Sequence, residues 1–431
     1  MNLQTKQALF RILRILLGAL FIFSGIVKCI DPTGGAIKIE DYFIAWGWLS
    51  SPWWLCMTLS VLQNIIEFTA GFMLISGVFL NVASFITLAF MVFFTPLTLY
   101  IALANPVSDC GCFGDALKIT NWQTFGKNIV FLAMAILVFL WRNIDGNGGK
   151  MWRQLAMTAM GVVVAGLVTM KGITDEPMMD FRPFAVGTDI KASMTIPEGA
   201  PMTEYKTTFI LEKDGVRKEF DEVNYPYEDS TWVFIDSKSD VVKEGYVPPI
   251  TDFSFVTPDG EDVSEILLGS TSPVFLAISP KLEKADADQM AKLGHQFELA
   301  QNNGFDFFLA TSSSSSEFIR ADSLAGFALN YLQADETLLK TIVRSNPGLI
   351  ILQNGVVVAK YNFDHMPFDE AMASPAASYL TITKHSYEWM MLVCLGLASV
   401  IVWLLLYGGK RRGRGKGAEN ESTQSNQNTN R

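Results

Sequence analysis

The most constraining feature of this 431-residue chain is a series of apolar stretches long enough to cross a lipid bilayer. A membrane-spanning helix needs about 20 predominantly apolar residues. Such stretches occupy residues 11–30, 53–79, 82–103, 125–141, 154–170 and 387–407. Because a backbone in lipid must satisfy its own hydrogen bonds, these stretches predict a multi-pass α-helical membrane bundle. The lipid bilayer is therefore the first expected partner.

Basic residues predict how the bundle is oriented. They gather at the N-terminus, in residues 142–153 and in the tail after residue 407. Alternating spans place these three segments on one side, which the positive-inside rule makes cytoplasmic. The sequence thus predicts an inner (cytoplasmic) membrane protein with both termini in the cytoplasm and residues 171–386 periplasmic or otherwise extracytoplasmic. No small-residue cleavage site follows the first span, so we interpret it as an uncleaved helix rather than a signal peptide.

Composition divides the chain into six expected segments. These are a four-span bundle (8–145), a fifth transmembrane helix (150–172), a β-rich segment (173–249), an α/β domain (250–372), a C-terminal transmembrane helix (387–407) and a disordered cytoplasmic tail (408–431). The tail is polar and rich in Asn, Gln, Ser and Gly. The net charge is −10, and no basic face with interleaved aromatic residues occurs, so nucleic acid is not an expected partner.

Turn residues and apolar runs predict the structure of the extramembrane part. Asp214-Gly215 and Asn354-Gly355 are hairpin signals, the second of type I′. The expected strands are 205–211, 216–220, 231–235, 253–256, 274–278, 305–309, 349–352 and 356–361. The expected helices are 282–302, 316–332 and 335–344. The pattern after residue 250 predicts an α/β sandwich.

Two cysteines lie one residue apart in the polar stretch Ser108-Asp109-Cys110-Gly111-Cys112-Phe113-Gly114-Asp115. Such a pair can exchange electrons as a dithiol and a disulfide, or form a structural bridge. Neighbouring Asp109 and Asp115 raise thiol pKa values and so favour the disulfide at rest. Two thiolates are too few for a tetrahedral zinc site and no histidine is near, so no metal site is predicted.

Glu67 is the acidic residue that lies deep inside a predicted span. Intramembrane carboxylates are costly and are often functional, so Glu67 is a candidate for proton transfer or quinone contact, or else for locking helix packing. Gln63 and Asn64 lie one turn away and could hydrogen-bond it. Lys28, at the end of the first span, is interpreted as a snorkelling anchor.

Other candidates are weaker. Lys127 and Asn128 begin the fourth span near the cysteine loop. Cys29 and Cys56 lie near the outer surface, where one could act as a resolving thiol, but a buried cysteine usually behaves as a small apolar residue.

The spans with Asp109-Cys110-Gly111-Cys112-Phe113-Gly114 after the third resemble the DoxX/MauE superfamily over about residues 8–145, and more specifically its MauE-type branch with a Cys-Gly-Cys-Phe-Gly motif. The resemblance implies a small helix-bundle membrane protein linked to quinone or sulfur redox chemistry. For the MauE-type branch it implies a role in maturing a disulfide-rich subunit during methylamine utilisation.

Residues 250–370 resemble a thioredoxin-like domain of the TlpA or peroxiredoxin type. Phe253-Ser254-Phe255 with Pro258-Asp259-Gly260 is similar to the entry segment, and Pro347 stands at the place of the family's cis-proline. The family's Cys-x-x-Cys is replaced by Ser279-Pro280-Lys281-Leu282, so this domain cannot exchange thiols itself.

Two functions remain open from the sequence. The first is a membrane thiol–disulfide oxidoreductase in which Cys110 and Cys112 form the redox pair, with Asp109 and Glu67 as further site residues and a quinone as the implied electron partner. An extracytoplasmic client protein would dock on the thioredoxin-like domain. The alternative is a non-enzymatic binding or assembly protein with a structural Cys110–Cys112 disulfide.

Overall fold

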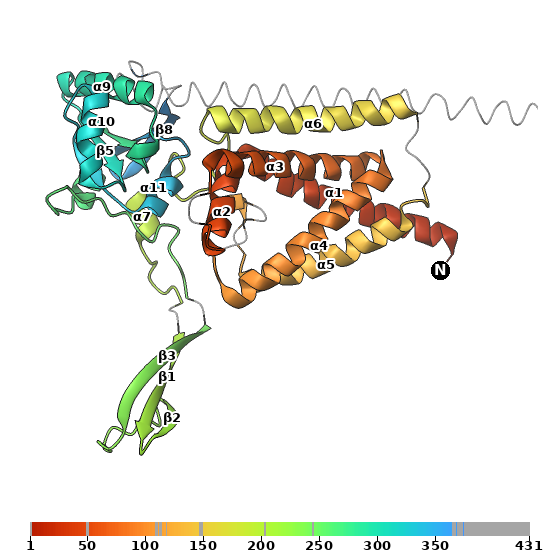
Figure 1. Ribbon diagram of the computed structural model, residues 1–431, viewed down its shortest axis with the longest axis horizontal. Helices are drawn as coiled ribbons and strands as arrows, with labels where there is room; N and C mark the ends of the chain where they lie inside the picture. Colours follow the sequence, from red (N-terminus) through yellow and green to blue (C-terminus); the bar gives the residue numbers. More distant parts are fainter. Residues whose placement is uncertain are drawn as a thin grey trace, which may run out of the picture.

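The computed structural model describes residues 2–48, 51–107, 111, 114–117, 119–145, 150–201, 204–243, 245–363, 368 and 374. Figure 1 shows a bundle of long helices, an α/β domain at one end of it and a three-stranded sheet that projects from that domain. The predicted span 387–407 and the tail 408–431 lie outside the described residues.

Among the residues that the structure describes, five helices are long and apolar enough to cross a membrane. They are α1 (Leu3–Ile30), α3 (Trp53–Ser76), α4 (Leu80–Ala104), α5 (Asn121–Trp141) and α6 (Met151–Thr174). They agree with the first five predicted spans. The protein is therefore a membrane protein with a multi-pass helical region, as hydropathy predicted.

Glycines allow a close contact between helices α1 and α3. A Cβ atom on Gly25 would lie 2.6 Å from the backbone nitrogen of Phe68, and one on Gly71 would lie 2.7 Å from the backbone oxygen of Gly18. Close backbone approach through small residues is the usual way in which helices associate in lipid. These glycines therefore fix α1 against α3.

The ends of the helices show that the spans alternate in direction. Arg11 near the start of α1 pairs with Asp145 after α5 at 2.9 Å. Gln154 at the start of α6 accepts a hydrogen bond from the backbone nitrogen of Phe79, between α3 and α4. The basic N-terminus and the basic 142–153 segment thus share one end of the bundle, as the charge pattern requires.

A short helix, α2 (Pro32–Ala45), crosses the opposite end of the bundle, although Pro32, Gly34 and Gly35 in the sequence indicate a loop there (Figure 1). Its start follows local chemistry: Asp31 accepts a hydrogen bond from the backbone of Gly34, and Pro32 occupies the first helical position. The 3₁₀ turn η1 (Gly114–Ala116) lies between α4 and α5.

The projecting sheet comprises β1 (Glu204–Lys213), β2 (Val216–Asp221) and β3 (Val233–Lys243) in the antiparallel order β2-β1-β3. Asp214 and Gly215 have positive φ, which confirms the predicted hairpin turn. Phe209 and Phe220 are paired across β1 and β2, and the rings of Tyr225 and Trp232 pack against them.

The α/β domain contains a mixed sheet of order β6-β5-β4-β7-β8. Its strands are β4 (Val274–Ile278), β5 (Asp306–Thr311), β6 (Tyr331–Gln333), β7 (Gly348–Gln353) and β8 (Val356–Asn362). Strands β5 and β6 run parallel to β4, whereas β7 and β8 form the antiparallel edge. Positive φ at Asn354 and Gly355 confirms the type I′ hairpin.

Helices cover both faces of this sheet. They are α7 (Ile190–Met194), α8 (Ser264–Gly269), α9 (Ala287–Asn302), α10 (Phe318–Ala325) and α11 (Glu336–Ile342), with 3₁₀ turns η2 (Leu282–Lys284) and η3 (Ser315–Glu317). One core packs β4 against α9 and α10, and the other packs it against α8 and α11. An α/β sandwich is thus present as predicted.

Two predictions in this domain are wrong in detail. Residues 253–256 form no strand, because Val256 makes only isolated bridges to Asp262 and Gln333. The expected helix 316–332 ends at Ala325, where Gly326 adopts a left-handed conformation and the chain enters strand β6. The Asn346–Pro347 peptide bond is cis, as expected at that position.

Candidate functional site

The bundle and the α/β domain together line a cavity of about 1030 Å³. Residues of α1 to α5 line its membrane part, and residues 177–183 and α11 line its extramembrane part. Its walls combine apolar side chains with charged groups, so the cavity suits a ligand with one polar and one apolar end.

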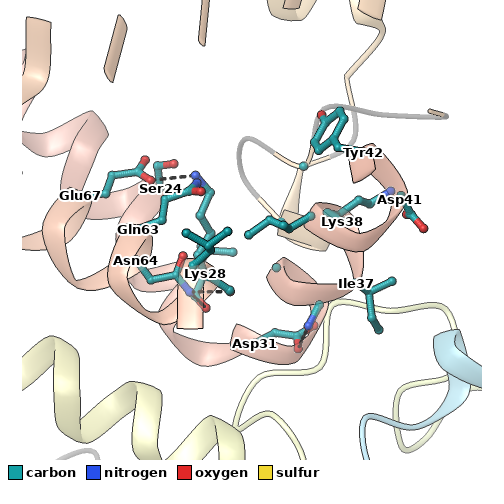
Figure 2. A pocket seen from close by; sticks show the side chains of 18 of the residues that line it. Ser24, Lys28, Asp31, Ile37, Lys38, Asp41, Tyr42, Gln63, Asn64 and Glu67 are labelled. Carbon is teal, nitrogen blue, oxygen red and sulfur yellow. Dashed lines mark hydrogen bonds and ion pairs between the residues drawn. The ribbon is translucent and has the colours of Figure 1, made fainter. Parts of the chain in front are cut away.

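A buried ion pair lies in the membrane part of this cavity. The Lys28 Nζ atom of α1 donates to the Glu67 Oε2 atom of α3 at 2.8 Å, and the two side chains are only 10% and 8% exposed. Figure 2 shows Lys28 extending to Glu67, with Ser24 and Gln63 beside them. The interpretation of Lys28 as a snorkelling anchor is wrong, because its ammonium group turns inward to neutralise Glu67.

Hydrogen bonds fix the helices around this pair. The Asn64 amide donates to the backbone oxygen of Lys28 at 2.9 Å, rather than to Glu67 as the sequence suggested. Ser60 donates to the backbone oxygen of Pro32, and Asn128 donates to the Thr98 hydroxyl at 3.2 Å. The polar residues of α3, α4 and α5 therefore hold the cavity walls in place.

The cysteine loop borders the same cavity through its glycines. Cys110, Cys112 and Asp109 lie outside the described residues, but Gly111 and Gly114 line the cavity. Both have positive φ, and a Cβ atom on Gly114 would lie 3.2 Å from Val27, the residue before Lys28. Two glycines of the cysteine loop therefore line the same cavity as the Lys28–Glu67 pair. Lys127 and Asn128 also line it.

Apolar side chains of α3 and α4 form the lipid-facing side of the cavity. They are Leu59, Leu62, Ile66, Phe93, Phe94 and Leu97. Leu62 is 51% exposed and Phe93 is 61% exposed although both line the cavity. In a membrane-spanning bundle such residues contact lipid, so the cavity borders the bilayer between α3 and α4.

Ion pairs join the α/β domain to α2 on the other side. Arg344 binds Asp31 through two nitrogens at 2.7 and 2.9 Å. Lys340 of α11 binds Glu40 at 3.1 Å. Burial raises the pKa of Asp31, but Arg344 and Arg182 outweigh it and hold the pKa below its ordinary value. Burial lowers the pKa of Lys340, but Glu336 and Glu40 outweigh it and raise the pKa.

The segment after α6 carries a second charge network. Arg182 donates to Glu176 at 2.8 Å and to Asp180 at 2.7 Å, and Lys360 of β8 donates to Asp180 at 2.6 Å. Burial raises the pKa of Asp180, but Lys360 and Arg182 outweigh it and lower the pKa. Burial and the nearby Arg182 lower the pKa of Lys360 to about 8. Glu176 also accepts a hydrogen bond from the backbone of Arg344, which ties this segment to the ion pair with Asp31.

The other candidate groups for thiol or metal chemistry lie apart from one another in the part of the chain that the structure describes. The Ser279 hydroxyl contacts the Asn346 side-chain oxygen at 2.6 Å, next to the cis bond, where the resemblance would place a thiol. Cys29 and Cys56 are free and buried in separate helices. Among the described residues no three His, Cys, Asp or Glu side chains form a metal-binding group.

The fold and the cavity define a multi-pass membrane protein with an extramembrane α/β domain. In a comparison with models of protein families, residues 6–142 match the family described as methylamine utilisation protein MauE. Residues 205–244, which include most of the projecting sheet, match a domain of unknown function, DUF8463. Comparisons with curated proteins and with solved structures gave no match. The first match and the five apolar helices together support a MauE-type membrane protein, in agreement with the resemblance found over residues 8–145.

Sequence reasoning found Glu67 and the cysteine loop but missed Lys28 as the partner of Glu67, and it missed the ion pair between Asp31 and Arg344. Lys28 and Asp31 could have been noticed as charges at the end of an apolar helix, facing a span that contains an acid. Arg344 gave no such signal, because its partner is 313 residues away in the chain.

Proposed function

We propose that the protein is a membrane thiol–disulfide redox factor for protein maturation, with Cys110 and Cys112 as its redox pair. The observation that carries the proposal is that Gly111 and Gly114 of the cysteine loop line the same cavity as the buried Lys28–Glu67 pair. A redox loop beside a lipid-bordered cavity can exchange electrons with a partner that dissolves in the membrane.

The reaction balances as a two-electron exchange. Two thiols of a client protein are oxidised to a disulfide as the Cys110–Cys112 disulfide is reduced to a dithiol through a mixed disulfide. The dithiol then closes again to the disulfide and releases two electrons and two protons. A quinone bound in the cavity would supply the acceptor for these electrons and protons.

The cavity residues fit such a group. The apolar side chains of α3 and α4 match an isoprenoid or alkyl tail, and the ammonium group of Lys28 is a hydrogen-bond donor for a ring oxygen. Glu67 pairs with Lys28 at 2.8 Å, at a depth where an isolated ammonium group would be costly. Asp109, next to Cys110, favours the thiol over the thiolate and so slows unspecific exchange.

The proposal also assigns a place and a role to the rest of the chain. The shared basic end of the bundle supports a cytoplasmic location for that end and an extracytoplasmic location for the α/β domain. The sheet order supports a thioredoxin-like domain. Since it contains no cysteine, this domain would dock the client rather than oxidise it.

A second candidate is a binding or assembly protein with a structural Cys110–Cys112 disulfide. The observation that favours it is the cysteine-free α/β domain, which is joined to α2 by several ion pairs. In that case the domain recognises a partner by shape, and the cysteine loop only braces α4 against α5.

Thiol trapping in intact cells separates the two. A mass-tagged maleimide is applied to cells with the unchanged chain and with Cys110→Ser, Cys112→Ser and Cys29→Ser variants, each with quinone turnover active or blocked. The redox factor predicts a partly reduced pair whose reduced fraction rises when quinone turnover stops. Cys29→Ser should behave as the unchanged chain. A pair that is fully oxidised under both conditions would leave only the assembly protein.

A further inference from the structure

We propose that the α/β domain is clamped over the extramembrane side of the cavity, so that the cavity exchanges its ligand with the lipid phase between α3 and α4. This deepens the proposed function and rests on it for the identity of the ligand. The clamp consists of the Asp31–Arg344 and Glu40–Lys340 ion pairs, which hold the α/β domain against α2 and its N-cap.

The first part of the argument is where the cavity wall comes from. Glu336, Lys340 and Arg344 line the extramembrane part of the cavity, together with Pro177 and Arg182 from the segment after α6. All of these belong to the polypeptide beyond the fifth membrane helix. The helices of the bundle therefore do not close this side by themselves.

The second part is how firmly that wall is attached. The Arg344 side chain is 9% exposed and grips Asp31 with two nitrogens, a geometry that adds both energy and orientation. Glu40 is buried and receives Lys340 at 3.1 Å, with Lys284 at 3.9 Å as a second cation. Replacing one partner of such a pair leaves an uncompensated charge at the contact, so a substitution at Arg344 or Lys340 should weaken the attachment.

The third part is the contrast with the lipid-facing side. There the cavity lining consists of the apolar side chains of α3 and α4, several of which remain largely exposed, as Leu62 and Phe93 do. No ion pair between α3 and α4 is present among the described residues. Side chains of this kind can be displaced by a lipid-soluble molecule without loss of hydrogen bonds. The ligand class is accordingly a neutral, membrane-dissolved amphiphile rather than a water-soluble ion.

The test measures from which phase the cavity can be entered. Gln63, which lines the cavity beside Glu67, is changed to cysteine in the full chain, and the protein is placed in lipid nanodiscs so that both faces are accessible. One sample receives an uncharged, lipid-soluble maleimide and the other a sulfonated, membrane-impermeant maleimide. Peptide mass spectrometry scores the adduct at residue 63 only, so the natural cysteines do not interfere.

The clamp is released by Arg344→Glu, and independently by Lys340→Glu in case the first variant does not fold. Each is paired with its charge swap, Asp31→Arg or Glu40→Lys in the same chain. Lys191→Glu is the matched control, because Lys191 of α7 forms an exposed ion pair with Glu265 of α8 and neither residue is among those that line the cavity. A monodisperse elution profile is required of every variant before labelling.

We expect Gln63→Cys in the otherwise unchanged chain to react with the lipid-soluble reagent and to resist the sulfonated one. Either release variant should speed labelling by the sulfonated reagent at least about tenfold, and its charge swap should reverse the change. Equal labelling by both reagents in the clamped chain, or no effect of either release variant, overturns the inference. Since Cys110 and Cys112 take no part in this labelling, its failure leaves the thiol-trapping result untouched, and the reverse holds as well.

Discussion

Breaking the Lys28–Glu67 pair from one side should destabilise the bundle far more than removing both charges together. The two atoms lie 2.8 Å apart and neither side chain is more than 10% exposed. Lys28→Met leaves a buried carboxylate and Glu67→Gln leaves a buried ammonium. An unpaired charge at this depth costs about 3 kcal/mol, which corresponds to a more than ~100-fold change in the folding equilibrium.

The double variant Lys28→Met/Glu67→Gln contains no unpaired charge, so it should lose no more than about 1 kcal/mol relative to the unchanged chain. The coupling energy of this double-mutant cycle should therefore exceed about 3 kcal/mol. Reversible unfolding by sodium dodecyl sulfate in mixed micelles, followed by tryptophan fluorescence, gives all four free energies. Single variants that each lie within about 1 kcal/mol of the unchanged chain, or effects that simply add, would contradict a buried ion pair.

Three further predictions concern packing and pH. Gly25→Leu should prevent a stable bundle, because a Cβ atom there meets the backbone of Phe68. Gly126→Leu should be tolerated, because no atom lies within 4 Å of a Cβ atom at that position. The fraction of monodisperse protein in detergent should distinguish the two variants. Leu276→Ala in the fully buried centre of the sheet should cost about 2–5 kcal/mol in thermal or urea unfolding. Lys360 has a pKa of about 8 in the folded protein, below its ordinary value of 10.5. Between these two values the unfolded chain binds more protons than the folded protein, so the free energy of unfolding should rise with pH across that window. The Lys360→Met variant should lack this rise.

The membrane part was largely predictable, because hydropathy over 20 residues is a local property of the chain. Helix α2 was missed because Pro32, Gly34 and Gly35 are local signals of a loop. In the structure Asp31 caps this segment and Ser60 of α3 donates a hydrogen bond to the backbone oxygen of Pro32, and the segment is helical. The two Asx-Gly hairpins were found correctly, since both turn residues must adopt positive φ and Asp, Asn and Gly do so most readily.

The site was only half predictable, because its pairings are not local. Glu67 stands out as a charge inside an apolar helix, but Lys28 is 39 residues away and lies at a helix end, where an anchor is the simpler interpretation. Strand β6 was hidden for a similar reason, since three residues carry too little pattern to be recognised without their partners on β5. Periodicity reports which face of an element is buried, but it does not report against which other element.

The projecting sheet also sets a length scale for this protein. Strand β3 has 11 residues, and at about 3.3 Å per residue it is roughly 36 Å long. The segments that connect the projecting sheet to the α/β domain are joined by two backbone hydrogen bonds, from Tyr246 to Pro201 and from Ile250 to Ser193. The base of the sheet is therefore fixed. A molecule bound near its tip is tethered within that radius of the domain, and tethers of this length correspond to local concentrations in the millimolar range. Even low-affinity binding to the sheet would then increase how often a molecule contacts the α/β domain.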